Sequence, residues 1–282
     1  MLKLATLAVT VGAATAAALQ GSRRTADERQ ADLAWDQLLG AAAAPSERFH
    51  PSMVAGLPEP AQRFFAYAIQ PGTQLSAAVE ITMEGELSLG TKEDPKYQPM
   101  RARQLLVSPH GLVWRVQAGS GWLRMSGSDG MVQGRSWTRF WLFGLVPIVR
   151  AGDSPDHSRA SFGRVVAEAA IWSPASVLPQ ANVQWRELDA DTARATVTHR
   201  GMVQEVDIRV NAQGQPLWVR IPRWTDANPQ KEFRVQPFGG ELSDFRQVGG
   251  YRLPFRVDGG NFFGTDDYFP FYRARVRDIR VL

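Results

Sequence analysis

The sequence predicts a mainly β fold of the α+β class, built on a long curved antiparallel sheet or half-barrel of about ten to eleven strands. A helix is expected on the concave face of this sheet, and further helices at the N-terminus. Three observations predict this fold. From Ala77 onward, apolar and polar residues alternate in short runs, which is the period of half-buried strands. These runs recur at the spacing of hairpins, and one strong helical pattern interrupts them.

That helical pattern spans residues 159–172. Its apolar residues recur at the spacing of a single buried helix face. They are Phe162, Val165, Val166, Ala169 and Trp172. Pro174 and Pro179 then end the helix and return the chain to the sheet. A helix that joins strands of one curved sheet covers its concave face, and a pocket between helix and sheet is therefore expected.

The chain opens with an apolar leader, residues 1–20, in which Lys3 precedes the apolar or small run Leu4–Leu19. This pattern is typical of a secretory signal peptide, and the run is short for a membrane-spanning helix. An uncleaved N-terminal membrane anchor and a buried N-terminal helix remain the alternatives. We expect an exported or membrane-anchored protein, on the periplasmic side of the inner membrane.

Residues 21–76 are predicted to form an N-terminal helical extension, and residues 77–282 the β domain. Thr25 and Glu28 match a capping box, which predicts a helix start at Thr25. Residues 56–69 carry two prolines at a predicted helix start, followed by an apolar face.

Within the β domain, the pattern predicts a first strand over residues 77–89 and a hairpin of Arg101–Val107 with Leu112–Ala118. A second hairpin is expected to turn at Gly127–Gly130. The remaining predicted strands are 193–198, 205–210, 217–221, 232–236, 241–248, 251–257 and 274–281.

Several function classes find no support in the sequence. Arginines are scattered among acids and form no basic run, so no nucleic-acid partner is expected despite a net charge of +4. The chain has no cysteine, and its four histidines are isolated, so we expect no metal. Nucleophile elbows, phosphate-binding loops and dinucleotide fingerprints are absent. We therefore assign no catalytic residue and no cofactor, and favour a protein that is not an enzyme.

Candidate ligand-binding residues lie on the predicted helix and on the strands that face it. Glu168 stands at the edge of the apolar helix face, one turn after Arg164. The two side chains suit either an i,i+4 ion pair or a polar group that orients a ligand head group. The wall of the expected pocket is assigned to Met83, Trp114, Val165, Ala169 and Trp172.

Two apolar clusters, residues 137–149 and 262–272, fall where the pattern predicts loops. They suit either caps over the ends of the barrel or a rim that contacts acyl chains or a bilayer surface.

Several short motifs, taken in order, resemble an uncharacterised bacterial family of unknown function over about residues 55–282. The motifs are L-P-x-P-A-Q-R-F-F at 57–65, L-V-W-R at 112–115, R-x-x-A-E-x-x-x-W-x-P at 164–174, V-x-W at 183–185, Arg223 after a strand, and G-x-R-L-P at 250–254. The sequence departs from the family after Pro254, where FRVDGGNFFG replaces a strand that tends to carry a tryptophan. The resemblance implies a fold like the LolA and LolB half-barrels that carry lipid-modified proteins, and it implies no catalytic residue.

These observations together predict a protein that binds or carries a lipid or another hydrophobic or amphipathic small molecule in the bacterial cell envelope, with membrane association through its N-terminus. Two alternatives stay open. One is a hydrolase that uses Glu168 or loop aspartates, and the other is a structural or partner-binding envelope protein without a ligand.

Overall fold

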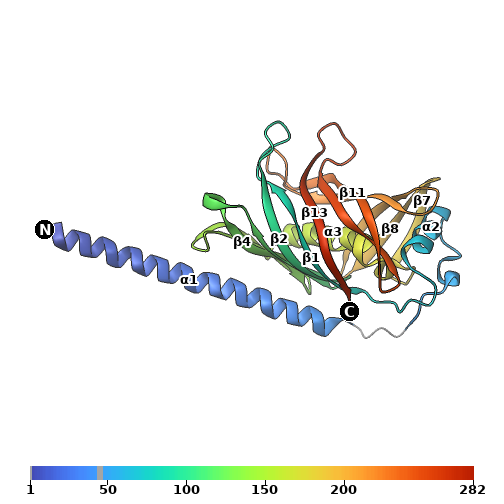
Figure 1. The fold of residues 1–282 in the computed structure, drawn as a ribbon, viewed down its shortest axis with the longest axis horizontal. Helices are drawn as coiled ribbons and strands as arrows, with labels where there is room; N and C mark the ends of the chain where they lie inside the picture. The colour runs from blue at the N-terminus through green and yellow to red at the C-terminus, as the bar shows by residue number, and fades with distance from the viewer. Residues whose placement is uncertain (1, 43–46) are drawn as a thin grey trace.

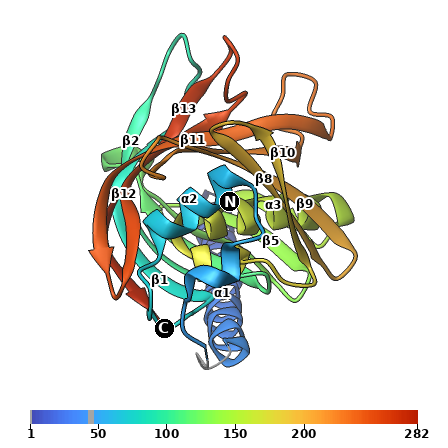
Figure 2. The ribbon, with the colours of Figure 1, turned by 90° about the vertical axis from the view of Figure 1, so that its right-hand side faces the viewer.

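The computed structural model describes the backbone of residues 2–42 and 47–282, and side chains from Ala18 onward except that of Trp122. Within these residues, thirteen strands form a single antiparallel sheet that curls without closing. Figures 1 and 2 show the curled sheet and the helix that it surrounds. The predicted half-barrel is thus confirmed, with two or three more strands than expected.

The strand order is simple. The first six strands run from the centre of the sheet to one edge, and the last seven return from the other edge until β13 pairs with β1. Their bounds are β1 Ala78–Ser88, β2 Tyr97–Val107, β3 Gly111–Ala118, β4 Met125–Val132, β5 Arg135–Leu142, β6 Val146–Gly152, β7 Val183–Asp189, β8 Thr192–His199, β9 Met202–Val210, β10 Pro216–Thr225, β11 Arg234–Val248, β12 Tyr251–Asn261 and β13 Phe269–Val281.

Helix α3, Pro155–Trp172, joins the two edge strands β6 and β7 across the concave face (Figure 1). It begins four residues before the predicted start, because Ser154 caps it: the Ser154 hydroxyl accepts a hydrogen bond from the backbone N–H of His157 at 3.1 Å. The helix ends at Trp172, before Pro174, as predicted, and a short 3₁₀ helix that was not predicted, η3 (Pro174–Val177), follows it.

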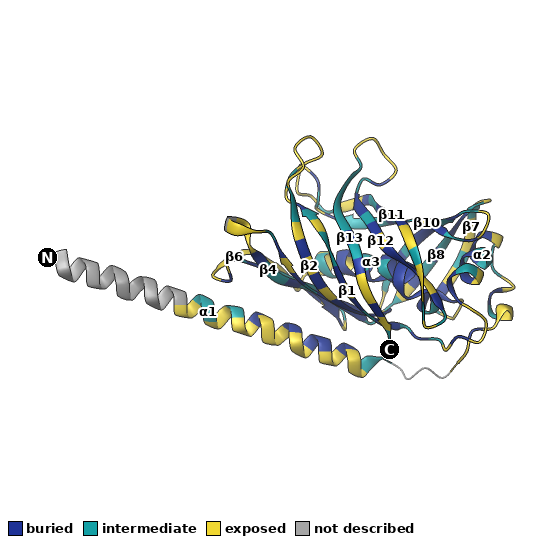
Figure 3. Cartoon of the chain, viewed as in Figure 1, coloured by how far each residue is buried: buried dark blue, intermediate teal, exposed yellow. Residues whose placement is uncertain are grey.

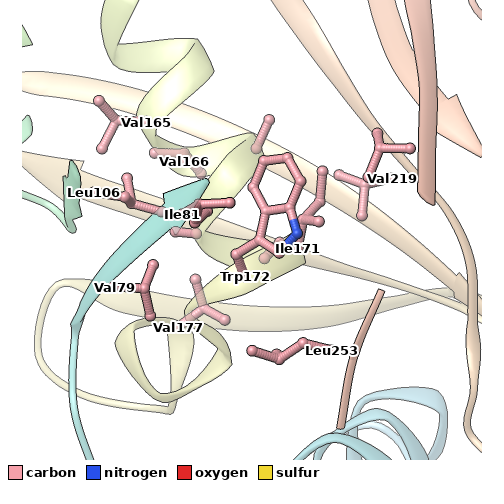
Figure 4. Close-up of a cluster of buried hydrophobic side chains, with 14 of the residues drawn as sticks. Val79, Ile81, Leu106, Val165, Val166, Ile171, Trp172, Val177, Val219 and Leu253 are labelled. Atoms are coloured by element: carbon pink, nitrogen blue, oxygen red, sulfur yellow. The ribbon is translucent and has the colours of Figure 1, made fainter. Parts of the chain in front are cut away.

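The main core fills the space between α3 and the sheet. Trp172 is its largest fully buried side chain and lies among apolar residues of β1, β10, β12 and α3 (Figure 4). Its indole N–H donates to the backbone carbonyl of Pro254 at 3.1 Å, so the one polar atom of the ring is satisfied. Figure 3 shows this buried interior beside the exposed outer surface.

Helix α1, Leu2–Ala41, runs without a break through the predicted start at Thr25, so that capping box is wrong. Thr25 instead donates its hydroxyl hydrogen to the carbonyl of Gly21, one turn earlier, at 3.0 Å. The C-terminal half of α1 packs Trp35 and Leu38 against the convex face, over β2, β3 and β4. Most of the predicted signal or anchor segment lies outside the described side chains. No helix among the described residues combines the length and apolar character needed to cross a membrane.

A second helix, α2 (Glu59–Ala68), and the 3₁₀ helix η1 (Pro51–Val54) sit at one end of the curled sheet (Figure 2). Phe64 and Phe65 of α2 are fully buried and contact the ring of Trp185 on β7. The helix predicted over residues 56–69 is therefore confirmed, and it closes this end of the concave face.

The predicted turn at Gly127–Gly130 is wrong, because β4 passes straight through it and the chain turns at Gln133 and Gly134. The glycines serve packing instead. A Cβ at Gly127 would lie 2.1 Å from the carbonyl oxygen of Arg139, and one at Gly130 would lie 2.6 Å from the Trp137 ring. The apolar cluster 137–149 was expected to be a loop. It lies instead in strand β5, the turn after it and strand β6.

Candidate functional site

A cavity of about 250 Å³ lies between α3 and the concave face. Its walls are mostly apolar, and Leu87, Phe140, Trp172, Val219, Phe238 and Phe271 form much of them. The volume sits just below the range of about 300–1,000 Å³ typical of small-molecule sites. The cavity can therefore hold a small amphiphile or one segment of a longer chain.

The cavity lies at the end of the sheet away from α2. Strand β12 shows this directly, since its first residue, Tyr251, pairs with Ile69 beside α2, whereas Gly259 near its other end lines the cavity. The same holds for β1, whose penultimate residue Leu87 lines the cavity. One end of the concave face is thus filled by aromatic core, and the other holds the cavity.

Arg164 and Glu168 enter the cavity from α3 as a buried ion pair. The Arg164 Nε lies 2.5 Å from a Glu168 carboxylate oxygen, and an Arg164 Nη lies 3.4 Å from the carboxylate of Asp129 on β4. Gln104 donates to the second Glu168 oxygen. Burial lowers the pKa of Arg164, but the charges of Glu168 and Asp129 outweigh it and raise the pKa. The Arg164 charge is thus neutralised within the protein, and no Glu168 oxygen is free to act as a base.

Arg223 of β10 lines the same cavity without such compensation. Its guanidinium carbon lies 4.7 Å from the centroid of the Phe238 ring, and its buried Nε has no hydrogen-bond partner among the described residues. Burial lowers the pKa of Arg223 and the neighbouring charge of Arg164 lowers it further, and the charges of Asp129, Glu168 and Asp226 offset these two effects only in part. The residue as a whole is only half-buried, and it lines the cavity. Arg223 is therefore a cation in the cavity wall that can form an ion pair with an anionic group.

Trp114 of β3 adds a second unsatisfied donor. Its indole N–H is buried without a hydrogen-bond partner among the described residues, although the residue lines the cavity. Its ring contacts Tyr272 at 6.3 Å between centroids, and the guanidinium of Arg164 lies 5.2 Å from it. Burial raises the pKa of Tyr272, so the phenol stays neutral and donates to the sulfur of Met83 at 2.8 Å. A polar ligand atom in the cavity would satisfy the Trp114 N–H.

The structure places the predicted site residues in two groups. Four of them line the cavity, namely Trp114, Arg164, Glu168 and Trp172. The other three, Met83, Val165 and Ala169, are fully buried core residues that do not line it.

Sequence reasoning missed Arg223, Asp129 and Phe238. A signal for Arg223 existed, because Val219, Ile221 and Arg223 share one face of β10, which puts a charged residue in the phase of the buried ones.

The other polar cluster near α3 is closed to a substrate. His157 Nδ1 lies 2.7 Å from the Ser136 hydroxyl, and its Nε2 lies 3.1 Å from the Thr138 hydroxyl. Ser136 is only 1% exposed and does not line the cavity, so its hydroxyl cannot reach a ligand there. Among the described residues, no three His, Cys, Asp or Glu side chains gather as a metal site requires.

The chain resembles a known family in sequence and, in part, a known structure in fold. The profile of a family described as "Family of unknown function (DUF6544)" matches residues 47–274, which confirms the resemblance that the motifs predict. No curated protein matches the sequence. The fold has partial similarity to the crystal structure of a domain from Vibrio parahaemolyticus that is named for outer membrane lipoprotein sorting. That comparison covers 72% of this chain and 85% of the other, with 11% identity and a TM-score of 0.38.

Proposed function

We propose a function for this chain, which belongs to the DUF6544 family of unknown function: it binds an amphipathic ligand with an anionic head group in the cavity between α3 and the sheet. The observation that carries the proposal is Arg223, a cation without a hydrogen-bonding partner among the described residues, set in an otherwise apolar cavity.

Two interactions would stabilise such a ligand in the cavity. Apolar walls take up hydrocarbon with a gain of about 0.8 kcal/mol per CH₂ group. An anion beside Arg223 and the Trp114 N–H supplies the acceptors that both donors lack, and charge-assisted hydrogen bonds are about twice as strong as neutral ones. The apo protein already holds the desolvated donors in place, so the ligand gains contacts at little ordering cost.

Fatty acids, lysophospholipids and other amphiphiles with a single chain fit this description. A cavity of about 250 Å³ is too small for a lipid with several chains to enter whole. The ligand class is therefore one carboxylate or phosphate head with one hydrocarbon segment.

The proposed compartment is the periplasmic side of the inner membrane, with membrane association through the N-terminus. The apolar leader with Lys3 before it supports this placement.

Mass spectrometry of solvent extracts from the purified full-length protein tests the proposal. We expect one anionic amphiphile per chain. Ala167→Phe should abolish its retention, because Ala167 lines the cavity and the larger ring would fill it. Ala212→Phe adds the same ring to an exposed turn and serves as the control. A protein that emerges empty and also fails to bind added fatty acid or lysophospholipid would overturn the proposal, as would equal binding by Ala167→Phe.

A further inference from the structure

The β5–β6 hairpin exposes apolar side chains at one place on the surface. Six of the thirteen large apolar residues that the described surface exposes belong to this hairpin and to the adjoining 3₁₀ helix η2 (Gly121–Leu123), so they form a patch. We call them the apolar tip: Leu123, Phe143, Leu145, Val146, Ile148 and Val149. The backbone N–H of Phe143 donates to the carbonyl of Arg124 at 2.9 Å, which holds the two turns together. From this patch we infer that the tip docks on the surface of a bilayer containing anionic lipid.

Charge around the tip fits that partner. Arg124 forms no ion pair with any described residue, and Arg24 of α1, which pairs with Glu28, reaches the carbonyl of Gly144 in the turn at 3.5 Å. Arg150 on β6 and Arg139 on β5 share the carboxylate of Asp27. Arginines therefore outnumber acids here. Basic residues beside exposed apolar side chains are the pattern that anionic membrane surfaces attract.

The course of the chain supports the same partner. Arg24 contacts the tip only a few residues after the apolar run Leu4–Leu19, so α1 brings that run to the same end of the molecule (Figure 1). A bilayer into which this apolar run inserted would lie against the apolar tip. Register also places the tip near the cavity end: Leu142 aligns through β4, β3 and β2 with Gly85 of β1, two residues before Leu87.

The free edge of β6 is poorly suited to pair with a strand of a second copy of the chain. Pro147 removes a backbone donor, and the register shifts between Phe140 and Trp141, which marks a bulge. Prolines and bulges are devices that prevent edge strands from pairing. The exposed side chains of the tip therefore suit a lipid surface better than another strand.

The absence of cysteine in the sequence allows a direct test with single-cysteine variants of the full-length protein. Leu145→Cys and Val203→Cys, labelled with an environment-sensitive fluorophore, would be mixed with vesicles of phosphatidylcholine, with or without phosphatidylglycerol, that carry brominated acyl chains. Val203 is the matched control, because its 56% exposure resembles the 54% of Leu145 and it lies on β9.

We expect the probe at position 145 to be quenched several-fold more than the probe at 203, and more with phosphatidylglycerol than without it. Arg124→Glu in the Leu145→Cys background should reduce the gain from phosphatidylglycerol. Protein that floats with vesicles while both probes stay equally unquenched would show attachment through the leader alone and would overturn the docking of the tip. Protein that floats with neither vesicle would overturn it as well, and neither result depends on what the cavity binds.

Discussion

The guanidinium of Arg223 lies on the ring of Phe238, 4.7 Å from its centroid, and forms no ion pair with a carboxylate of the described residues. Eighteen arginines among the described residues form an ion pair with Asp or Glu, whereas Arg223 stacks on a ring in the cavity without one. A buried donor without a partner destabilises the free protein. The proposed anionic ligand would supply the missing acceptor.

Replacing Arg223 by methionine should separate ligand binding from stability. We expect Arg223→Met to lower the affinity for an anionic single-chain amphiphile at least tenfold, and to raise the free energy of unfolding of the empty protein by about 1 kcal/mol. Isothermal titration and urea unfolding measure the two effects. Arg159→Met is the control, since the exposed Arg159 also stacks on a ring, that of Trp224 at 4.3 Å, outside the cavity. Equal affinities for the wild type and Arg223→Met would contradict the assigned role.

Breaking the buried pair on α3 should have the opposite effect on stability. Glu168→Ala leaves Asp129 as the carboxylate paired with Arg164, and we expect a loss of up to about 3 kcal/mol in the free energy of unfolding. Glu59→Ala removes a pair of the same spacing with Arg63, but Glu59 is largely exposed, so its loss should stay below about 1 kcal/mol. Chemical denaturation of both variants makes the comparison. Similar losses in the two would show that burial does not strengthen the pair at position 168.

The fold was predictable because its signals are local. Alternation after Ala77 specifies half-buried strands, and the face of Phe162, Val165 and Trp172 specifies a helix that covers them. Gly127 and Gly130 led to the wrong prediction of a turn. They are glycines because a side chain at either position would clash with residues of the neighbouring strands. Only the assembled sheet reveals that requirement.

The candidate site was predictable only on α3. Arg164 and Glu168 stand one turn apart in the sequence, so their pairing follows from helix geometry. Asp129 and Gln104 come from separate strands, and no local pattern brings them to Arg164. Met83 has the alternation of a wall residue but lies behind Tyr272, which reaches the cavity in its place.

The attachment of α1 to the convex face should depend on pH through Asp27. Burial alone would raise the pKa of this carboxyl, but the hydrogen bond and charge of Arg150, the charge of Arg139 and the Trp141 N–H lower it below its ordinary value of 3.8. Because the folded pKa is the lower one, the stabilisation is complete above the unfolded value and is lost as the pH falls through the folded one.

The expected result is a free-energy difference between wild type and Asp27→Asn of about 1–3 kcal/mol at neutral pH, which shrinks toward zero as the solution is acidified below pH 3.8. Denaturant unfolding followed by tryptophan fluorescence across this range measures it, since Trp141 contacts Asp27. Asp32→Asn, five residues further along α1 in an exposed pair with Arg115, should show a much smaller difference at every pH. A difference for Asp27→Asn that persists at low pH would contradict the electrostatic account.

Gly163 in the middle of α3 tests how closely this helix packs on the sheet. Alanine favours a helix over glycine by up to about 1 kcal/mol, but a Cβ at position 163 would lie 2.9 Å from the side-chain oxygen of Gln204 and 3.3 Å from Ile221. Gln204 cannot swing away, because its amide donates to the carbonyls of Glu205 and Pro222 at 2.8 and 3.1 Å. Overpacking of this kind costs about 1–3 kcal/mol, so we expect Gly163→Ala to lower stability by about 1 kcal/mol.

A control glycine on α1 and a double variant complete this test. Gly21→Ala, where an added Cβ meets nothing within 4 Å, should leave stability unchanged or raise it. Gln204→Ala should cost less in the Gly163→Ala background than in the wild type, because it removes the oxygen that the new methyl group crowds. Thermal unfolding of the four variants measures both differences. If Gly163→Ala stabilised the protein as much as Gly21→Ala does, α3 would stand further from β9 and β10 than the structure places it.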